Sequence, residues 1–123
     1  DYEQWQRFRH FLQENVSPII DKCWNQGVFP QQIVPQFGQF LKKEFGDTEY
    51  IYPPPNTLAF RLLKMELGRI DPSMASFFAV HWGLAMGSIS MFGSKEQKKK
   101  WLPPMQTMKK NWFLGSHGTK LWF

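Results

Sequence analysis

Four lysines fall within six residues, Lys95, Lys98, Lys99 and Lys100, in the stretch "FGSKEQKKKWLPPM". Such a cluster could bind an anion, and the net charge of +5 is compatible with nucleic acid, a phospholipid surface or a phosphate-bearing cofactor. The same charge also lies in the ordinary range that keeps a small domain soluble. Charge alone therefore leaves anion binding open.

Residues on either side of the lysines favour a solvated helix face. Ser94 and Gln97 have the spacing of a capping box, in which each side chain bonds a free backbone N–H at a helix start. In that helix Trp101 and Leu102 turn inward, and the lysines face water. The two prolines that follow should end the helix, because proline has no N–H.

Residues that could ligate a metal are few and scattered. The chain has one cysteine, Cys23, and three histidines, and their spacing matches no metal site. A single cysteine excludes a disulfide within the chain and favours either a reducing compartment or indifference to the redox state. The sequence shows no charged-then-apolar leader before the first helix, and no apolar run has the length of a membrane span. We therefore expect no metal centre, no targeting signal and no membrane span; because the first residue is Asp1, a leader or longer N-terminus outside this sequence stays open.

Apolar periodicity predicts an all-α fold, an up-and-down bundle of about five helices with a buried fourth helix. The expected helices are residues 3–24 with a kink or a restart at Pro18, 30–43, one capped by Asn56, 71–92, and one capped by Ser94. In the third helix, Leu58, Leu62 and Met65, together with Leu63, are the expected core positions. The fourth helix is apolar nearly all round, so it should be central.

Small residues recur along the expected fourth helix, among them Ala75, Ala79, Gly83 and Gly87. Small side chains let two backbones approach, which favours close helix packing. They also leave room beside the helix, which favours the wall of a ligand cleft. Composition leaves both interpretations open.

Several motifs together resemble one protein family. They are Glu66, Arg69 and Asp71 in an E-x-x-R-x-D segment, His81 in the middle of a helix, and Gly93, Ser94, Gln97, Lys98, Leu102 and Pro103 in a G-[ST]-x-x-Q-K-x-x-x-L-P signature. "NVSPII" and the "FP" before the second helix match the same family. Over residues 1–110 the chain is similar to the N-terminal helical domain of acyl-CoA dehydrogenases and acyl-CoA oxidases, nearest in character to glutaryl-CoA dehydrogenase and the short-chain acyl-CoA oxidases.

The resemblance implies a flavoprotein oxidoreductase of fatty acid metabolism, which introduces an α,β double bond into an acyl-CoA thioester. A glutamate of the C-terminal domain takes the α-proton and FAD takes the β-hydride, so we expect no catalytic or cofactor-binding residue here and no turnover by this chain alone. The implied partners are further copies in a tetramer or dimer, and electron-transfer flavoprotein or oxygen as acceptor, without nucleic acid. The compartment would be the mitochondrial matrix or the peroxisome in a eukaryote, and the cytoplasm in a bacterium.

In this family the N-terminal domain supplies subunit contacts and one wall of the acyl pocket. The resemblance makes one side of the fourth helix the candidate acyl-chain wall, namely Ser76, Ala79, Val80, Gly83 and Leu84. Glutaryl-specific members carry an Arg-Ser pair where this chain has Ala75 and Ser76. Without that arginine to hold a second carboxylate, the resemblance implies a neutral acyl chain.

The last residues depart from the family. Residues 111–123 are "NWFLGSHGTKLWF", where the family has a strand and a Leu-Thr-Glu-Pro loop that contacts flavin and substrate. One choice of codons for this stretch, read one base later, encodes Ile-Gly-Phe-Leu-Ala-Leu-Thr-Glu-Pro-Asn-Tyr-Gly-Ser. We therefore expect a family-like domain over residues 1–110 and an aberrant tail over 111–123, a frameshifted start of the β-domain, with a natural terminus as the alternative. The Pro-rich loop at 44–55 has no explanation in the family pattern.

Two other functions stay open from the sequence. One is a stand-alone basic helical module that uses its lysines on nucleic acid or an acidic partner. Against it, the lysines are not interleaved with exposed aromatics, and no helix-turn-helix or heptad pattern occurs. The other is a non-catalytic truncated subunit, because this domain contributes to oligomer contacts in the family.

Overall fold

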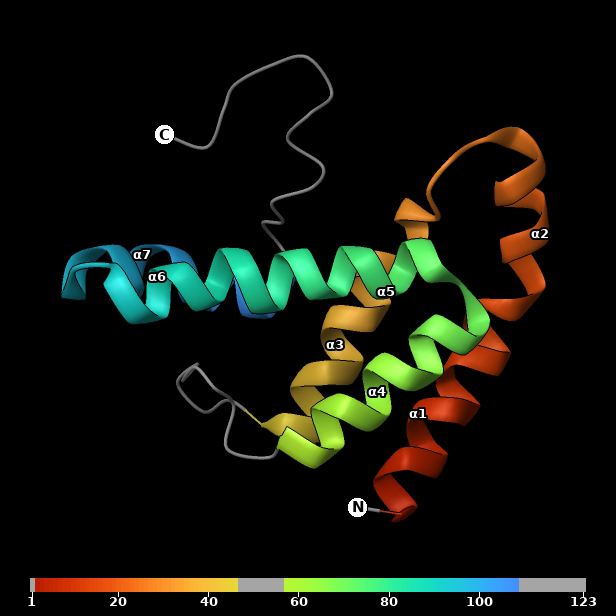
Figure 1. Ribbon diagram of the computed structural model, residues 1–123, viewed down its shortest axis with the longest axis horizontal. Helices are drawn as coiled ribbons and strands as arrows, with labels where there is room; N and C mark the ends of the chain where they lie inside the picture. Colours follow the sequence, from red (N-terminus) through yellow and green to blue (C-terminus); the bar gives the residue numbers. More distant parts are fainter. Residues whose placement is uncertain (1, 47–56, 109–123) are drawn as a thin grey trace.

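The computed structural model describes residues 2–46 and 57–108, which fold into helices and short connections (Figure 1). The helices are α1 Tyr2–Asn15, α2 Ser17–Gln26, the 3₁₀ turn Gln31–Ile33, α3 Val34–Phe45, α4 Thr57–Ile70, α5 Pro72–Phe78, the π-helical segment Ala79–Ala85, α6 Met86–Phe92 and α7 Lys95–Gln106. The predicted all-α fold is confirmed. The predicted Asn56 cap, most of the Pro-rich loop and the tail 111–123 lie outside the described residues.

Of the two outcomes predicted at Pro18, a kink or a restart, the structure has the restart, with a break between α1 and α2. Pro18 lies in the first turn of α2, where its missing N–H leaves no helical hydrogen bond unmade. The Val16 N–H still bonds the Leu12 carbonyl at 2.9 Å, so the chain bends without losing contact. Ile20 of α2, which is 8% exposed, continues the buried stripe of Leu12 and Val16 across the bend.

Aromatic rings fill the core between α1, α3, α4 and α5. Phe8, Phe37 and Phe78 are almost fully buried, and the last two meet edge to face with centroids 5.8 Å apart. Phe60 of α4 stacks on Phe45 of α3 at 4.4 Å. Each such aromatic pair adds about 0.5–1.5 kcal/mol beyond the burial of its area. These rings hold α5 against α3 and α4.

The core face of α4 differs from the prediction. Leu58 and Met65, expected inside, are 51% and 69% exposed, and Leu62 is half-buried. The buried positions are instead Ala59, Phe60, Glu66 and Leu67, together with the predicted Leu63. The apolar spacing in the sequence did not reveal this face of α4, because one of its buried positions is the charged residue Glu66. Glu66 can lie there because its carboxylate accepts a hydrogen bond from the Trp5 indole of α1 at 3.0 Å.

α5, the π-helical segment and α6 join into one helix, residues 72–92, which we call the central helix (Figure 1). It begins, as predicted, after Asp71, whose side chain accepts a hydrogen bond from the Met74 N–H at 3.0 Å. The helix extends past α3 and α4, so the burial of its far half is one-sided, and Leu84 and Phe92 are 66% and 82% exposed. By length and composition it could cross a membrane, but core helices pass the same test.

α7 begins as predicted but ends later. The Ser94 hydroxyl accepts a hydrogen bond from the Gln97 N–H at 3.2 Å, and the Ser94 N–H donates to the Gln97 side chain at 2.9 Å, which is the predicted capping box. The helix was expected to stop at its two prolines and instead continues through them. Its last turn is held because Leu102 and Met105 are buried, and because the Thr107 hydroxyl bonds the proline carbonyls at 3.3 and 3.4 Å.

Candidate functional site

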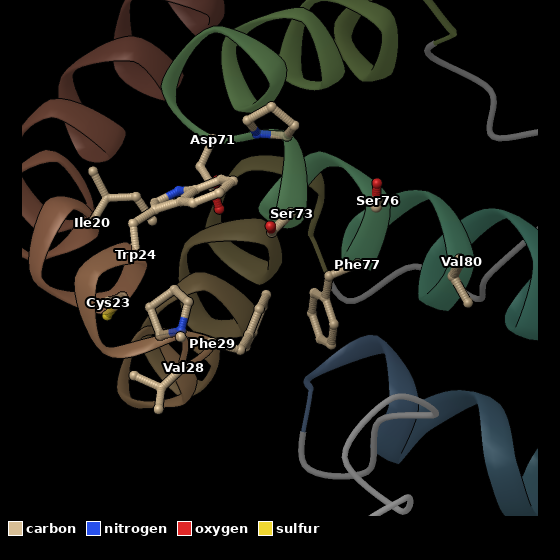
Figure 2. A pocket seen from close by; sticks show the side chains of 13 residues that line it. Ile20, Cys23, Trp24, Val28, Phe29, Asp71, Ser73, Ser76, Phe77 and Val80 are labelled. Atoms are coloured by element: carbon tan, nitrogen blue, oxygen red, sulfur yellow. The ribbon is translucent and has the colours of Figure 1, made fainter.

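Two grooves along the central helix share Val80. The first, which we call the α2 groove, has a volume of about 520 Å³ (Figure 2). Its lining includes Trp24, Phe29, Asp71, Ser76, Phe77 and Val80. The second, the α7 groove, has a volume of about 530 Å³. Its lining includes Val80, Leu84, Ile89, Phe92, Trp101 and Met105.

The predicted wall residues divide between these grooves. Ser76 and Val80 line the α2 groove, and Val80 and Leu84 line the α7 groove, so the three form one line along the central helix. Ala79 and Gly83 line neither groove. A Cβ added to Gly83 would meet no atom within 4 Å, so close helix packing does not require a glycine there.

A hydrogen bond holds Trp24 as one wall of the α2 groove. The indole Nε1–H donates to Asp71 Oδ1 at 3.0 Å, while Oδ2 of the same carboxylate caps the central helix. Trp24 is 62% exposed, yet this bond fixes its ring between α2 and the start of α5 (Figure 2). Farther along the groove the rings of Phe29 and Phe77 lie 5.1 Å apart. Because both Asp71 oxygens are engaged, the groove suits an uncharged apolar ligand.

His81, singled out from the sequence, lines neither groove. It is fully buried in the π-helical segment, and its Nε2–H donates to the Met105 carbonyl at 2.9 Å. Burial lowers the pKa of His81 below its ordinary value of 6.5, and the Met105 carbonyl offsets part of that effect. The neutral ring therefore ties α7 to the central helix, which is a positioning role.

Three groove residues outside the central helix could not be assigned to a site from the sequence. Trp24 falls on the polar side of the apolar stripe of the first helix, so no pattern marks it. Phe29 belongs to the "FP" that opens the second helix, which signals a helix start and not a groove. Trp101 was predicted to turn inward, and it is half-buried where it lines the α7 groove.

Among residues 2–46 and 57–108, no group of three His, Cys, Asp or Glu side chains could hold a metal ion. The residues that line the two grooves include no lysine or arginine that could neutralise the diphosphate of FAD. No step of flavin chemistry is therefore assigned to these residues.

Comparisons with known proteins identify relatives along the whole described chain. Residues 3–109 match the family model of the acyl-CoA dehydrogenase, N-terminal domain. Mitochondrial isobutyryl-CoA dehydrogenase of Dictyostelium discoideum is 25% identical over 117 residues, which cover 89% of this chain and 27% of the relative. Human mitochondrial short-chain specific acyl-CoA dehydrogenase is 29% identical over 105 residues, covering 80% and 24%. A short-chain specific acyl-CoA dehydrogenase of Clostridium acetobutylicum is 25% identical over 119 residues, covering 92% and 29%.

The match extends over the described helices, and the chain spans about a quarter of the length of these relatives. The helix caps at Asp71 and Ser94, which belong to the motifs of the resemblance, are both formed in the structure. Because the family model covers residues 3–109 of 123, this chain belongs to the acyl-CoA dehydrogenase family, through its N-terminal domain.

Proposed function

We propose that residues 1–110 are the N-terminal helical domain of an FAD-dependent acyl-CoA dehydrogenase or oxidase, and that Ser76, Val80 and Leu84 form part of its acyl-pocket wall, flanked by Ala79 and Gly83. The family match supports the enzyme class. The observation that carries the wall is the shared residue Val80, where two apolar grooves meet along the central helix. An extended acyl chain needs a continuous apolar surface of this kind.

The wall suits a neutral acyl chain. Ala75 stands where the resemblance places an arginine in glutaryl-specific enzymes, and no lysine or arginine lines either groove. A second carboxylate at the end of the acyl chain would lose water here without gaining a charged partner. The relatives named for isobutyryl-CoA and for short-chain substrates agree with a neutral chain.

In this proposal the redox step depends on domains beyond residue 110. FAD, when bound in the whole protein, supplies the hydride acceptor, and a glutamate of the C-terminal domain takes the α-proton. Residues 111–123, which lie outside the described residues, are the frameshifted start of the β-domain. The whole protein is a homo-oligomer that passes electrons to electron-transfer flavoprotein or to oxygen. The domain described here contributes an apolar wall that excludes water from the acyl chain.

Photolabelling of the 123-residue chain with an acyl-CoA that carries a diazirine at the end of its acyl chain tests the wall. Photolysis should label the central helix at Val80 and Leu84, because these side chains line the apolar grooves. A photogenerated carbene captures whatever it touches, so labelling reports contact even when occupancy is low. Peptide mass spectrometry identifies the labelled residues, and excess unlabelled acyl-CoA should suppress the labelling.

Met65 is the matched control for this experiment. It is as exposed as Leu84, at 69% against 66%, but lies on α4 outside both grooves. Labelling at Val80 and Leu84 with little at Met65 would support the wall. Labelling that follows exposure alone, with Met65 as strongly marked as Leu84, would contradict it.

A further inference from the structure

The turn between α6 and α7 carries exposed apolar side chains at one end of the molecule. Phe92 is 82% exposed and Met91 is 56% exposed. In Figure 1 this end stands clear of α1 to α4 along the longest axis, and α6 and α7 contact each other there. The capping box between Ser94 and Gln97 holds the turn in one conformation. We call residues 91–100 the α6–α7 tip.

The same tip carries a cluster of cations. Its lysines are Lys95, Lys99 and Lys100, which are exposed, and Lys98, which is partly exposed. Glu96 is the one acidic residue of α7. Phe92 is exposed beside them, and the Lys100 Nζ lies 5.1 Å from the centre of the Trp101 ring.

We propose that the α6–α7 tip docks the protein on an anionic phospholipid bilayer, with Phe92 and Met91 at the level of the head groups and the lysines on the acidic lipids. Interfacial binding combines burial of apolar side chains with attraction of cations to acidic lipids, and the tip offers both on one rigid turn. Phe92 could also stack on a nucleic acid base, but the exposed apolar Met91 beside it in the chain matches acyl chains better than bases. Docking goes beyond the proposed enzyme function and does not depend on it.

Flotation of the 123-residue chain with lipid vesicles tests the docking. Vesicles of phosphatidylcholine mixed with phosphatidylserine should bind the chain, and vesicles of phosphatidylcholine alone should bind it weakly. Phe92→Ser should weaken binding at least about tenfold, because the variant loses the aromatic side chain that would be buried in the bilayer. The double variant Lys99→Ser, Lys100→Ser should weaken it about twenty-five-fold, at about fivefold for each lysine near an acidic surface. Added salt should weaken binding further by screening the lysines.

Matched variants on other helices control for the effects of net charge and exposed hydrophobicity that do not depend on the tip. Met65→Ser on α4 and the double variant Lys42→Ser, Lys43→Ser on α3 remove exposed side chains of the same kinds and should keep full binding. Equal losses in the two lysine double variants would overturn the tip as the docking site, and so would full binding by Phe92→Ser. Equal affinity for a short DNA duplex would overturn lipid as the partner. Circular dichroism checks that each variant is folded.

Discussion

Replacing Gly38 with alanine should lower the free energy of unfolding by about 3 kcal/mol, in the upper part of the range for an over-packed core. Gly38 lies in α3, and a Cβ there would be 2.5 Å from the Thr107 carbonyl oxygen and 2.8 Å from the Met108 Cβ. Real Cβ atoms essentially never approach other heavy atoms within 3.0 Å. The variant therefore folds only if α3 and the end of α7 move apart.

That movement is costly because the atoms in the way are backbone atoms or a Cβ, and not the far end of a flexible side chain. Thr107 follows the last residue of α7. Met108 is 3% exposed and has a φ of 59°, a conformation that non-glycine residues rarely adopt. Moving this segment would expose Met108 and Met105, which are both part of the core.

Urea and thermal unfolding followed by circular dichroism measure the effect. A loss of this size should lower the melting temperature by about 10 °C for a chain of this length. Gly83→Ala is the matched control, because a Cβ at that helical position meets nothing within 4 Å. It should keep stability or raise it by up to about 1 kcal/mol, since alanine favours helix over glycine. Equal stability of the two variants would contradict the contact between α3 and the end of α7.

Acid should weaken the fold through His81. Burial lowers the pKa of His81 below 6.5, whereas in the unfolded chain the ring titrates near that value. Between the two pKa values the unfolded chain binds a proton that the folded chain does not. The free energy of unfolding should therefore fall as the pH drops below about 7, by at most about 1.4 kcal/mol per pH unit for one histidine. The stabilisation is fully present at pH values above the pKa of His81 in the unfolded chain, and it is lost as the pH falls towards the pKa of His81 in the folded chain.

Two substitutions separate the charge of His81 from its hydrogen bond. His81→Gln keeps an N–H donor for the Met105 carbonyl but cannot titrate, so its stability should no longer show this loss in acid. His81→Phe leaves that carbonyl without its imidazole donor and should cost about 1–3 kcal/mol above pH 7. His10→Gln, on the exposed side of α1, should leave the acid loss in place. Acid sensitivity of His81→Gln as steep as that of the parent chain would assign the effect to another group.

Helix starts could be predicted from the sequence because capping depends on residues only three positions apart. Asp71 starts the central helix and Ser94 starts α7, each through a bond to the backbone N–H three residues later. Gly27 likewise ends α2, with a φ of 64° that favours glycine. Local chemistry decides these boundaries, so a single sequence carries the information.

Contacts between distant helices could not be predicted in this way. The core face of α4 was wrong because Glu66, a charged residue, lies inside through its bond to Trp5. α7 continues through its two prolines because burial of Leu102 and Met105 outweighs the lost backbone hydrogen bonds. In both cases tertiary packing overrides a rule that considers only neighbours in sequence.

The residues that line the grooves could likewise be predicted only in part from the sequence. Ordinary helical spacing places Ser76, Ala79, Val80, Gly83 and Leu84 on one side of the helix. Of these five residues, only Ser76, Val80 and Leu84 line the grooves in the structure, and they are spaced four residues apart. The π-helical segment Ala79–Ala85 has wider turns than an α-helix and changes the spacing of aligned residues. The apolar pattern of a sequence does not predict a π-helical segment. The opposite walls of the grooves come from α2 and α7, which lie outside the central helix.

The coding DNA across codons 105–123 and beyond tests most directly whether this chain is the front domain of a flavin-dependent acyl-CoA dehydrogenase. We predict that residues 111–123, read one base later, give Ile-Gly-Phe-Leu-Ala-Leu-Thr-Glu-Pro-Asn-Tyr-Gly-Ser. That frame should continue open into a β-domain and a C-terminal helical domain with its glutamate. Codons that cannot encode this string, or a stop codon directly after it in that frame, would contradict the proposed function.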